Sequence, residues 1–182
     1  DLTFSRILRS VLRHDPDTLM IGEIRDLETA EIAVQAALTG HLVLSTLHTN
    51  SASSALTRLA DMGLEPYRIS ASITAVVAQR LVRTLCEYCR TPAPGDDGEA
   101  TIYEAAGCER CGGTGYNGRT SIAEIMIIDE PLRALILQGA ESQVIEKAAR
   151  AGGLQPMRQN GLQKVAWGKT SIAEVMRVLG NG

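Results

Sequence analysis

Several features that would point to particular protein classes are scarce or missing in this chain of 182 residues. Aromatic residues make up only 3% of it, so the apolar content is mostly aliphatic, as expected for helices packed on a parallel sheet. The formal net charge is −3, and the lack of a net basic field argues against nucleic acid as the main partner. No apolar run approaches the length of a membrane span, and the sequence does not open with a signal-peptide pattern. Because the first residue is Asp1, we expect a fragment of a longer protein.

Two short apolar runs predict neighbouring strands of a parallel sheet. Leu19–Ile21 leads to Glu23, and Leu42–Leu47 leads to His48, with a helical pattern over 27–38 between them. Open α/β folds bind their ligands at the carboxyl ends of parallel strands. We therefore expect Glu23 and His48 to share a crevice, where they could orient and deprotonate a water beside a phosphate. From the residues alone, both could also be solvated polar groups that flank a strand.

The stretch that holds these strands resembles the secretion ATPases that power type II secretion and type IV pilus assembly. Residues 22–26 (Gly-Glu-Ile-Arg-Asp) are similar to their Walker B segment, and residues 39–50 to their histidine box. The likeness continues through residues 79–86 and the four cysteines, so it covers nearly the whole chain. It implies that Glu23 is the catalytic Walker B glutamate and that His48 reaches toward the γ-phosphate.

By this resemblance the fold is α/β. It would be the C-terminal half of a RecA-like motor domain, with a tetracysteine zinc element and a small helical C-terminal subdomain. The expected boundaries of these three segments are 1–85, 86–118 and 119–182. His41 joins Glu23 and His48 as a nucleotide-binding residue, and ATP and Mg²⁺ are the expected cofactors of the full-length protein.

The resemblance also implies where the parent protein acts. We expect a hexameric cytoplasmic ATPase, peripheral to the inner membrane, that works with inner-membrane secretion platform proteins. The zinc element points to the assembly and secretion branch and away from the retraction motors, which lack it. Residues 77–86 favour type II secretion, through pseudopilus assembly, over type IV pilus assembly. The alternative from another class is a non-catalytic, zinc-stabilised interaction module.

The four cysteines form two Cys-x-x-Cys pairs, Cys86 with Cys89 and Cys108 with Cys111. Each pair can supply two thiolates to one metal ion from a tight knuckle. Two pairs together complete a tetrahedral four-thiolate zinc site. Such a site has no open coordination position, so we expect a structural Zn²⁺ ion. The other interpretation is four free or disulfide-bonded cysteines. Acidic residues outnumber basic ones between Cys86 and Cys111, which opposes a nucleic-acid role for the element.

The chain lacks the phosphate-binding loop that ATP chemistry of this class needs, Gly-x-x-x-x-Gly-Lys-Ser/Thr. Gly168-Lys169-Thr170 looks like the end of such a loop, but Gln163 stands where its first glycine should be, and the preceding residues read as helix. By resemblance the true loop lies upstream of Asp1. We therefore expect that this chain alone does not hydrolyse ATP at a meaningful rate.

The seven-residue word Thr-Ser-Ile-Ala-Glu-Ile/Val-Met occurs twice, at 120–126 and 170–176. The first copy is rich in β-branched residues and predicts a strand, whereas the second matches a capping box and predicts a helix start. Residues 91–100 are predicted to be a polar loop. The helices predicted from periodicity and stop signals are 2–13 with Thr3 as N-cap, 51–62, 67–85, 131–138, 142–151 and 156–167.

Overall fold

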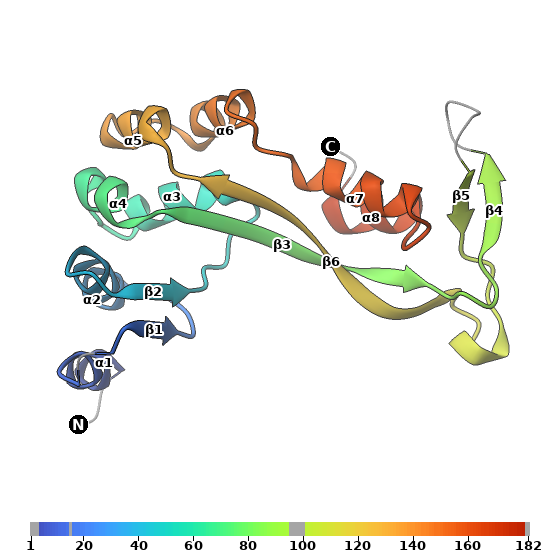
Figure 1. The fold of residues 1–182 in the computed structure, drawn as a ribbon, viewed down its shortest axis with the longest axis horizontal. Coiled ribbons are helices and arrows are strands. Elements are labelled where there is room, and N and C mark those ends of the chain that lie inside the picture. Colours follow the sequence, from blue (N-terminus) through green and yellow to red (C-terminus); the bar gives the residue numbers. More distant parts are fainter. Residues whose placement is uncertain (1–3, 15, 95–100, 181–182) are drawn as a thin grey trace. The chain divides into compact units, whose positions relative to one another are not determined.

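The polypeptide folds as two units, and each unit is assembled from two separate stretches of the chain. The computed structural model describes residues 4–14, 16–94 and 101–180. The first unit comprises residues 1–76 and 125–154, and the second comprises residues 77–124 and 155–182. In chain order (Figure 1) the elements are α1 (Phe4–Leu12), β1 (Thr18–Ile21), α2 (Leu27–Leu38), β2 (Leu42–Ser45), α3 (Ala52–Asp61), α4 (Pro66–Ser72), β3 (Ala75–Leu85), β4 (Thr91–Pro94), β5 (Thr101–Glu104), the 3₁₀ turn η1 (Glu109–Cys111), β6 (Tyr116–Ile127), α5 (Glu130–Leu137), α6 (Ser142–Ala151), α7 (Met157–Ala166) and α8 (Ile172–Leu179).

The first unit contains the predicted strand–helix–strand arrangement. β1 and β2 pair in parallel, from Thr18 opposite Leu42 to Ile21 opposite Ser45. The helix between them, α2, begins after Asp26, whose carboxylate accepts a hydrogen bond from the Thr29 amide at 2.8 Å. Both strands therefore end at the same edge of the sheet, as the sequence predicts.

One face of these two strands is covered and the other is exposed. The covered face packs against α1 and α2, and its buried core residues are Leu8, Leu19, Ile21, Ile32, Ala33 and Ala36. On the other face the exposed fractions are 77% for Met20, 55% for Leu42 and 50% for Leu44. Apolar side chains on both faces are typical of strands that are buried on both sides in a larger parallel sheet.

The helix predicted over residues 67–85 is wrong beyond its first two turns. α4 ends at Ser72 and the chain continues as β3. Apolar residues spaced three and four apart suggested a helix, but the β-branched residues after Ile73 favour extended backbone. Pairing with β6, far away in the sequence, decides between the two. β3 and β6 run side by side in opposite directions in Figure 1.

The polar loop predicted over residues 91–100 is also wrong in its first part. Residues 91–94 form β4, which pairs antiparallel with β5, Thr91 lying opposite Glu104 and Pro94 opposite Thr101. Prolines are uncommon in strands but are tolerated at an edge, where the missing N–H is not needed by a neighbour. Residues 95–100 of the predicted loop lie outside the described residues.

The two copies of the repeated word adopt the two predicted conformations. The first lies in β6, and the second begins α8. In the second copy the Ser171 hydroxyl accepts a hydrogen bond from the Glu174 amide, so the N-cap half of the predicted capping box forms. The other half does not, because the Glu174 carboxylate accepts hydrogen bonds from Arg83 and Arg177. Two nearly identical seven-residue segments thus adopt different structures, one in a strand and one at the start of a helix, because each packs against different parts of the protein.

The remaining helices form close to their predicted positions. α5 and α6 lie in the first unit, and α7 and α8 lie in the second. α1 also forms, although its predicted N-cap, Thr3, lies outside the described residues. None of the helices in the described part of the chain has both the length and the apolar character that a membrane crossing needs. The three-segment division at residues 85 and 118 stays a prediction.

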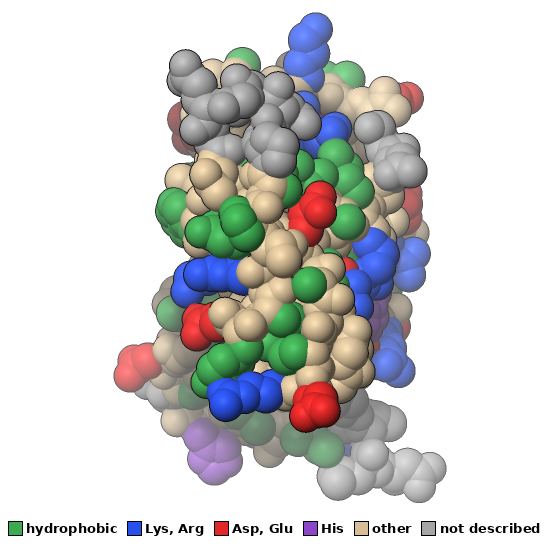
Figure 2. Space-filling view, turned by 90° about the vertical axis from the view of Figure 1, so that its right-hand side faces the viewer, with side chains coloured by type: hydrophobic (Ala, Val, Ile, Leu, Met, Phe, Trp, Pro, Cys, Tyr) green, Lys and Arg blue, Asp and Glu red, His purple; other side chains and the backbone are tan. Residues whose placement is uncertain are grey.

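Charged side chains of both signs are distributed over the surface drawn in Figure 2. On that face, among the described residues, both acidic and basic side chains lie among apolar ones. This distribution agrees with the absence of a net basic field in the sequence.

A buried carboxylate attaches α8 to β3 in the second unit. Glu174 is 1% exposed. It accepts hydrogen bonds from the Arg83 amide and guanidinium at 2.6–2.9 Å and from the Arg177 guanidinium at 2.7 Å. Arg83 also stacks on the ring of Tyr116, 4.1 Å from its centroid. Burial alone would raise the pKa of Glu174, but the hydrogen bonds from Arg177 and Arg83 outweigh it and lower the pKa to about 2.

Replacing this carboxylate should destabilise the chain in a pH-dependent way. Because the folded pKa of Glu174 lies below its usual value of 4.5, its ionisation stabilises the fold above about pH 4.5, and this contribution is lost as the pH falls toward 2. We expect Glu174→Gln to lower the free energy of unfolding by roughly 2 kcal/mol at pH 7 and by less at pH 3. The value at pH 7 is smaller than the pKa shift alone would give, because the guanidinium groups that pair with Glu174 are partly exposed to solvent. Urea unfolding at the two pH values measures this difference.

Glu146→Gln is the matched control, because Glu146 forms an exposed ion pair with Arg150 at 2.6 Å. Its loss should change stability by less than about 0.5 kcal/mol at either pH. Equal effects of the two substitutions would contradict the role given to Glu174.

Candidate active site and metal centre

The structure brings Glu23 and His48 together at the edge where β1 and β2 end. Two backbone-anchored contacts join the two segments that follow these strands. The Ile24 amide donates to the Thr46 carbonyl at 3.1 Å, and the Thr46 hydroxyl donates to the Gly22 carbonyl at 2.6 Å. Glu23 Oε2 then lies 3.2 Å from His48 Nε2. The predicted proximity of the carboxylate and the imidazole is therefore present.

Arg25 is a third member of this group, although from the sequence we assigned it no role beyond its place in the Gly22–Asp26 motif. Its Nη2 atom lies 2.6 Å from Glu23 Oε1. The hydrogen bond from Arg25 is the largest influence on Glu23, and with a smaller one from His48 it lowers the pKa of the carboxyl. Glu23 is therefore ionised at neutral pH. The sequence did contain a signal for this pair. Glu23 and Arg25 are two residues apart and both follow the end of β1, so their side chains lie near the same edge of the sheet.

His41 does not join this group. It directly precedes β2, so it lies at the opposite edge of the sheet from Glu23 and His48. Its Nδ1 atom lies 3.0 Å from the Ala36 carbonyl oxygen and 3.2 Å from the Thr39 hydroxyl, both at the C-terminal end of α2. An imidazole there satisfies a terminal helix carbonyl, which is a common structural role for histidine.

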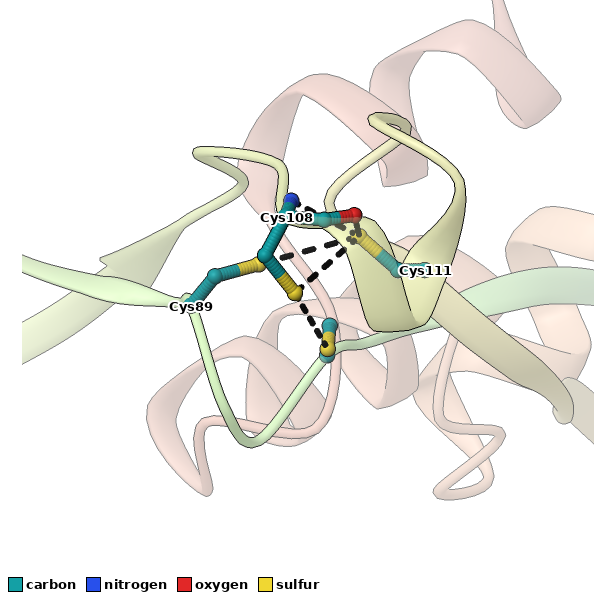
Figure 3. Close-up of side chains that lie close together, drawn as sticks. Cys89, Cys108 and Cys111 are labelled. Atoms are coloured by element: carbon teal, nitrogen blue, oxygen red, sulfur yellow. Dashed lines mark hydrogen bonds between the residues drawn. The ribbon is translucent and has the colours of Figure 1, made fainter.

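The four cysteines converge in the second unit. Their Sγ atoms all lie within 4.8 Å of one another, and all four are free. Figure 3 shows the sulfurs of Cys89, Cys108 and Cys111 directed toward one another. The Sγ separations are 4.0 Å for Cys86 and Cys108, 3.8 Å for Cys89 and Cys111, and 3.8 Å for Cys108 and Cys111. A tetrahedron of sulfurs about 2.3 Å from zinc has edges of about 3.8 Å, so these residues fit a zinc ion.

The backbone around the cluster is arranged to support thiolates. The amides of Cys108 and Gly115 each donate to Cys111 Sγ at 3.2 Å. These bonds, that of Cys108 foremost, lower the pKa of Cys111 to about 6, whereas burial raises the pKa of Cys89 to about 12. The two amide contacts thus favour the thiolate form of Cys111, which is the form that coordinating cysteines take in zinc sites.

Two glycines make the tight second knuckle possible. Gly107 and Gly115 have φ values of +107° and +74°, a conformation that other residues rarely adopt. A Cβ at Gly107 would lie 2.5 Å from the Gly113 carbonyl oxygen, and one at Gly115 would lie 2.6 Å from the Cβ of Ala105. Any side chain at either position would push the knuckle apart.

A solved motor protein shares this arrangement of elements. The α/β fold is similar to the crystal structure of the pilus retraction motor PilT with bound ADP, with a TM-score of 0.70 and 28% sequence identity over 96% of this chain and 43% of that chain. The fold is thus that of ATPase motor domains. The chain belongs to the Type II/IV secretion system protein family, whose pattern matches residues 1–177.

Similar curated proteins belong to the same family. The chain is 53% identical to the type II secretion system protein HxcR of Pseudomonas aeruginosa and 52% identical to the type II secretion system ATPase E of Vibrio cholerae, over 98% of this chain in both cases. It is 48% identical to the type IV pilus assembly ATPase PilB of Thermus thermophilus over 96% of this chain. It spans 37% of the length of the first two relatives and 21% of the third.

The cluster geometry predicts one metal ion per chain. We expect the purified chain to bind one equivalent of Zn²⁺, and Cys108→Ser to weaken the affinity by more than about 100-fold, because outer hydrogen-bonding partners of metal ligands already contribute 10- to 100-fold. Competition with a chromophoric chelator measures both. Four reactive thiols should appear after the metal is removed. Fewer than four thiols would instead indicate disulfides and contradict a zinc site.

Proposed function

We propose that this chain is the C-terminal part of an ATPase motor that drives protein secretion through the type II system, by assembly of a pseudopilus. The observation that carries this proposal is the 3.2 Å contact between Glu23 and His48 at the carboxyl edge of two parallel strands. The names of the relatives at 52–53% identity support the type II assignment, although the chain covers 37% of their length.

In the full-length protein, Glu23 orients and activates the water that attacks the γ-phosphate of ATP. One Glu23 oxygen faces Arg25 and the other faces His48, and each oxygen keeps a lone pair that can accept a hydrogen bond from water. The lowered pKa keeps the carboxylate ionised, as a base requires. The His48 side chain is 86% exposed and is free to contact a γ-phosphate and stabilise its charge. His41, at the other edge of this sheet, stays a prediction as a nucleotide-binding residue.

The phosphates and Mg²⁺ would be held by a phosphate-binding loop in another part of the full-length protein. Mg²⁺ neutralises charge on the transferring phosphoryl group in enzymes of this kind. Gly168-Lys169-Thr170 does not serve as that loop, because it follows α7 and its backbone and hydroxyl groups are engaged within the second unit. The chain thus contributes the water-activating half of the site.

The exposed sheet face supports the idea that the rest of the motor packs against this chain. Leaving the side chains of Met20, Leu42 and Leu44 in water costs about 25 cal/mol for each Å² of apolar surface that an upstream half could cover. We propose that the parent protein is a cytoplasmic hexamer, peripheral to the inner membrane, in contact with the secretion platform there. Nucleic acid is not expected as a partner, given the net charge of −3.

We also infer that the four cysteines bind a structural zinc ion. Four thiolates leave no open position for a substrate, so the ion would stabilise the knuckles and take no part in hydrolysis.

Two other functions remain to be compared with this proposal. The 48% identity to PilB supports pilus assembly as the alternative motor function. A non-catalytic interaction module is the alternative without ATP chemistry. The two motors differ in the filament that they assemble. An interaction module would differ from both, because its function would not require the Glu23 carboxylate.

Glu23→Gln in the full-length protein separates a motor from a module. We expect ATPase turnover to fall by about 100-fold or more, the range for loss of a general base, and secretion to stop while oligomer assembly remains normal. Phosphate release and a secretion assay measure these effects. Glu31→Gln is the control, because Glu31 is an exposed glutamate on α2. Normal secretion by the Glu23 variant would favour the interaction module.

The isolated chain should neither bind nor hydrolyse Mg²⁺-ATP measurably. Calorimetric titration of Mg²⁺-ATP into the zinc-loaded chain should give no heat of binding, because the phosphate-binding loop is absent. Turnover that Glu23→Gln abolishes would overturn this expectation and would place a nucleotide site within the chain itself.

A further inference from the structure

The turn Gly168–Thr170 makes contacts that the proposed motor function does not use. Gly168 follows the C-cap of α7 with φ of +65°, the left-handed conformation that often ends a helix. A Cβ there would lie 2.9 Å from the ring of Tyr103 and 3.0 Å from the Arg90 guanidinium. The turn therefore packs directly against residues beside the cysteine cluster.

Three hydrogen bonds tie this turn to the end of β3 and the first cysteine knuckle. The Leu85 amide donates to the Lys169 carbonyl at 2.9 Å, the Arg90 guanidinium to the Gly168 carbonyl at 2.6 Å, and the Thr170 hydroxyl to the Arg83 carbonyl at 2.8 Å. Leu85 immediately precedes Cys86, and Arg90 immediately follows Cys89. The bonds therefore hold the first pair of cysteines from both sides.

We propose that Arg90 and the Gly168–Thr170 turn position Cys86 and Cys89 for metal binding. They touch no sulfur, so they are positioning residues and not ligands. This inference rests on the proposed zinc site.

The physical reason is preorganisation. A Cys-x-x-Cys knuckle that is free to move must be ordered when an ion binds, and that ordering reduces the affinity. Here the Leu85 amide on one side of the knuckle and the Arg90 side chain on the other are already bonded to the turn between α7 and α8. Arg90 is further fixed by stacking on Tyr103, 4.5 Å from the ring centroid. Removing the turn's contacts should therefore weaken metal binding although all four thiols remain.

The coupling must also run in the other direction. If the turn raises the affinity for the ion, the ion stabilises the contacts of the turn by the same factor. Binding of the ion should then slow hydrogen exchange of the Leu85 amide, whose acceptor is the Lys169 carbonyl.

Arg90 and Arg110 form a matched pair for testing this inference. Each directly neighbours a cysteine of the cluster, and each stacks on a tyrosine, Arg110 lying 4.0 Å from the ring centroid of Tyr88. Both carry the charge that would favour nearby thiolates. Arg90 also donates to the turn, whereas Arg110 stacks on Tyr88 within the cysteine element itself.

The experiment is titration of the full 182-residue chain with Co²⁺, followed by the cobalt–thiolate absorption in competition with a chelator. We expect Arg90→Gln to weaken Co²⁺ binding by about tenfold and Arg110→Gln to change it by less than about twofold. Equal losses in the two variants would overturn the inference, since they would reflect charge alone. Unchanged affinity in Arg90→Gln would overturn it as well. If the unaltered chain binds no Co²⁺, the metal site itself is refuted, and this inference falls with it.

Thr170 provides a second test that leaves the charge unchanged. Its side chain is fully buried, and Thr170→Val keeps the shape while removing the hydroxyl donor. We expect weaker Co²⁺ binding and faster exchange of the Leu85 amide in the metal-bound chain, with both restored in Thr170→Ser. Circular dichroism checks that each variant is folded. Folded Thr170→Val with unaltered affinity and exchange would count against the role of the turn.

Discussion

The parallel pairing of β1 with β2 is the constraint on which the candidate active site depends. Because Ile21 lies opposite Ser45, the residues that follow both strands emerge at one edge of the sheet. The Thr46 hydroxyl and the Ile24 amide then join the two following segments, and Glu23 reaches His48. A shift of one residue in this register would turn the side chains of one strand to the other face and separate the pair.

The second unit is organised by polar contacts between segments that are distant in sequence. One cluster of its apolar core contains Val82, Ile122 and Met157, and Leu85, Val165 and Val175 are buried as well. Glu174 fixes α8 to β3, and the turn after α7 holds the first cysteine knuckle. Small domains commonly rely on a metal ion or on ionic networks in addition to their apolar core. The fit of the four cysteines to zinc is consistent with that need.

Most of the fold and the candidate sites could be predicted because their signals are local. Asp26 marks the start of α2, apolar runs mark β1 and β2, and two Cys-x-x-Cys pairs mark the metal cluster. The wrong secondary-structure predictions occur where pairing with a segment distant in sequence determines the conformation. β3 was predicted as helix because its apolar spacing fits both conformations, and only pairing with β6 selects the strand.

The sequence by itself determined which residues can carry chemistry: the glutamate and histidine at strand ends, the four thiols, and the absence of a phosphate-binding loop within the chain. Tertiary structure alone decided that Arg25 pairs with Glu23, that His41 lies at the other edge of the sheet, and that the Gly168–Thr170 turn contacts the cysteine knuckle. The reason is physical. Chemical identity and local backbone preference are properties of neighbouring residues, whereas a contact between residues 78 positions apart, as between Arg90 and Gly168, exists only once both elements have packed.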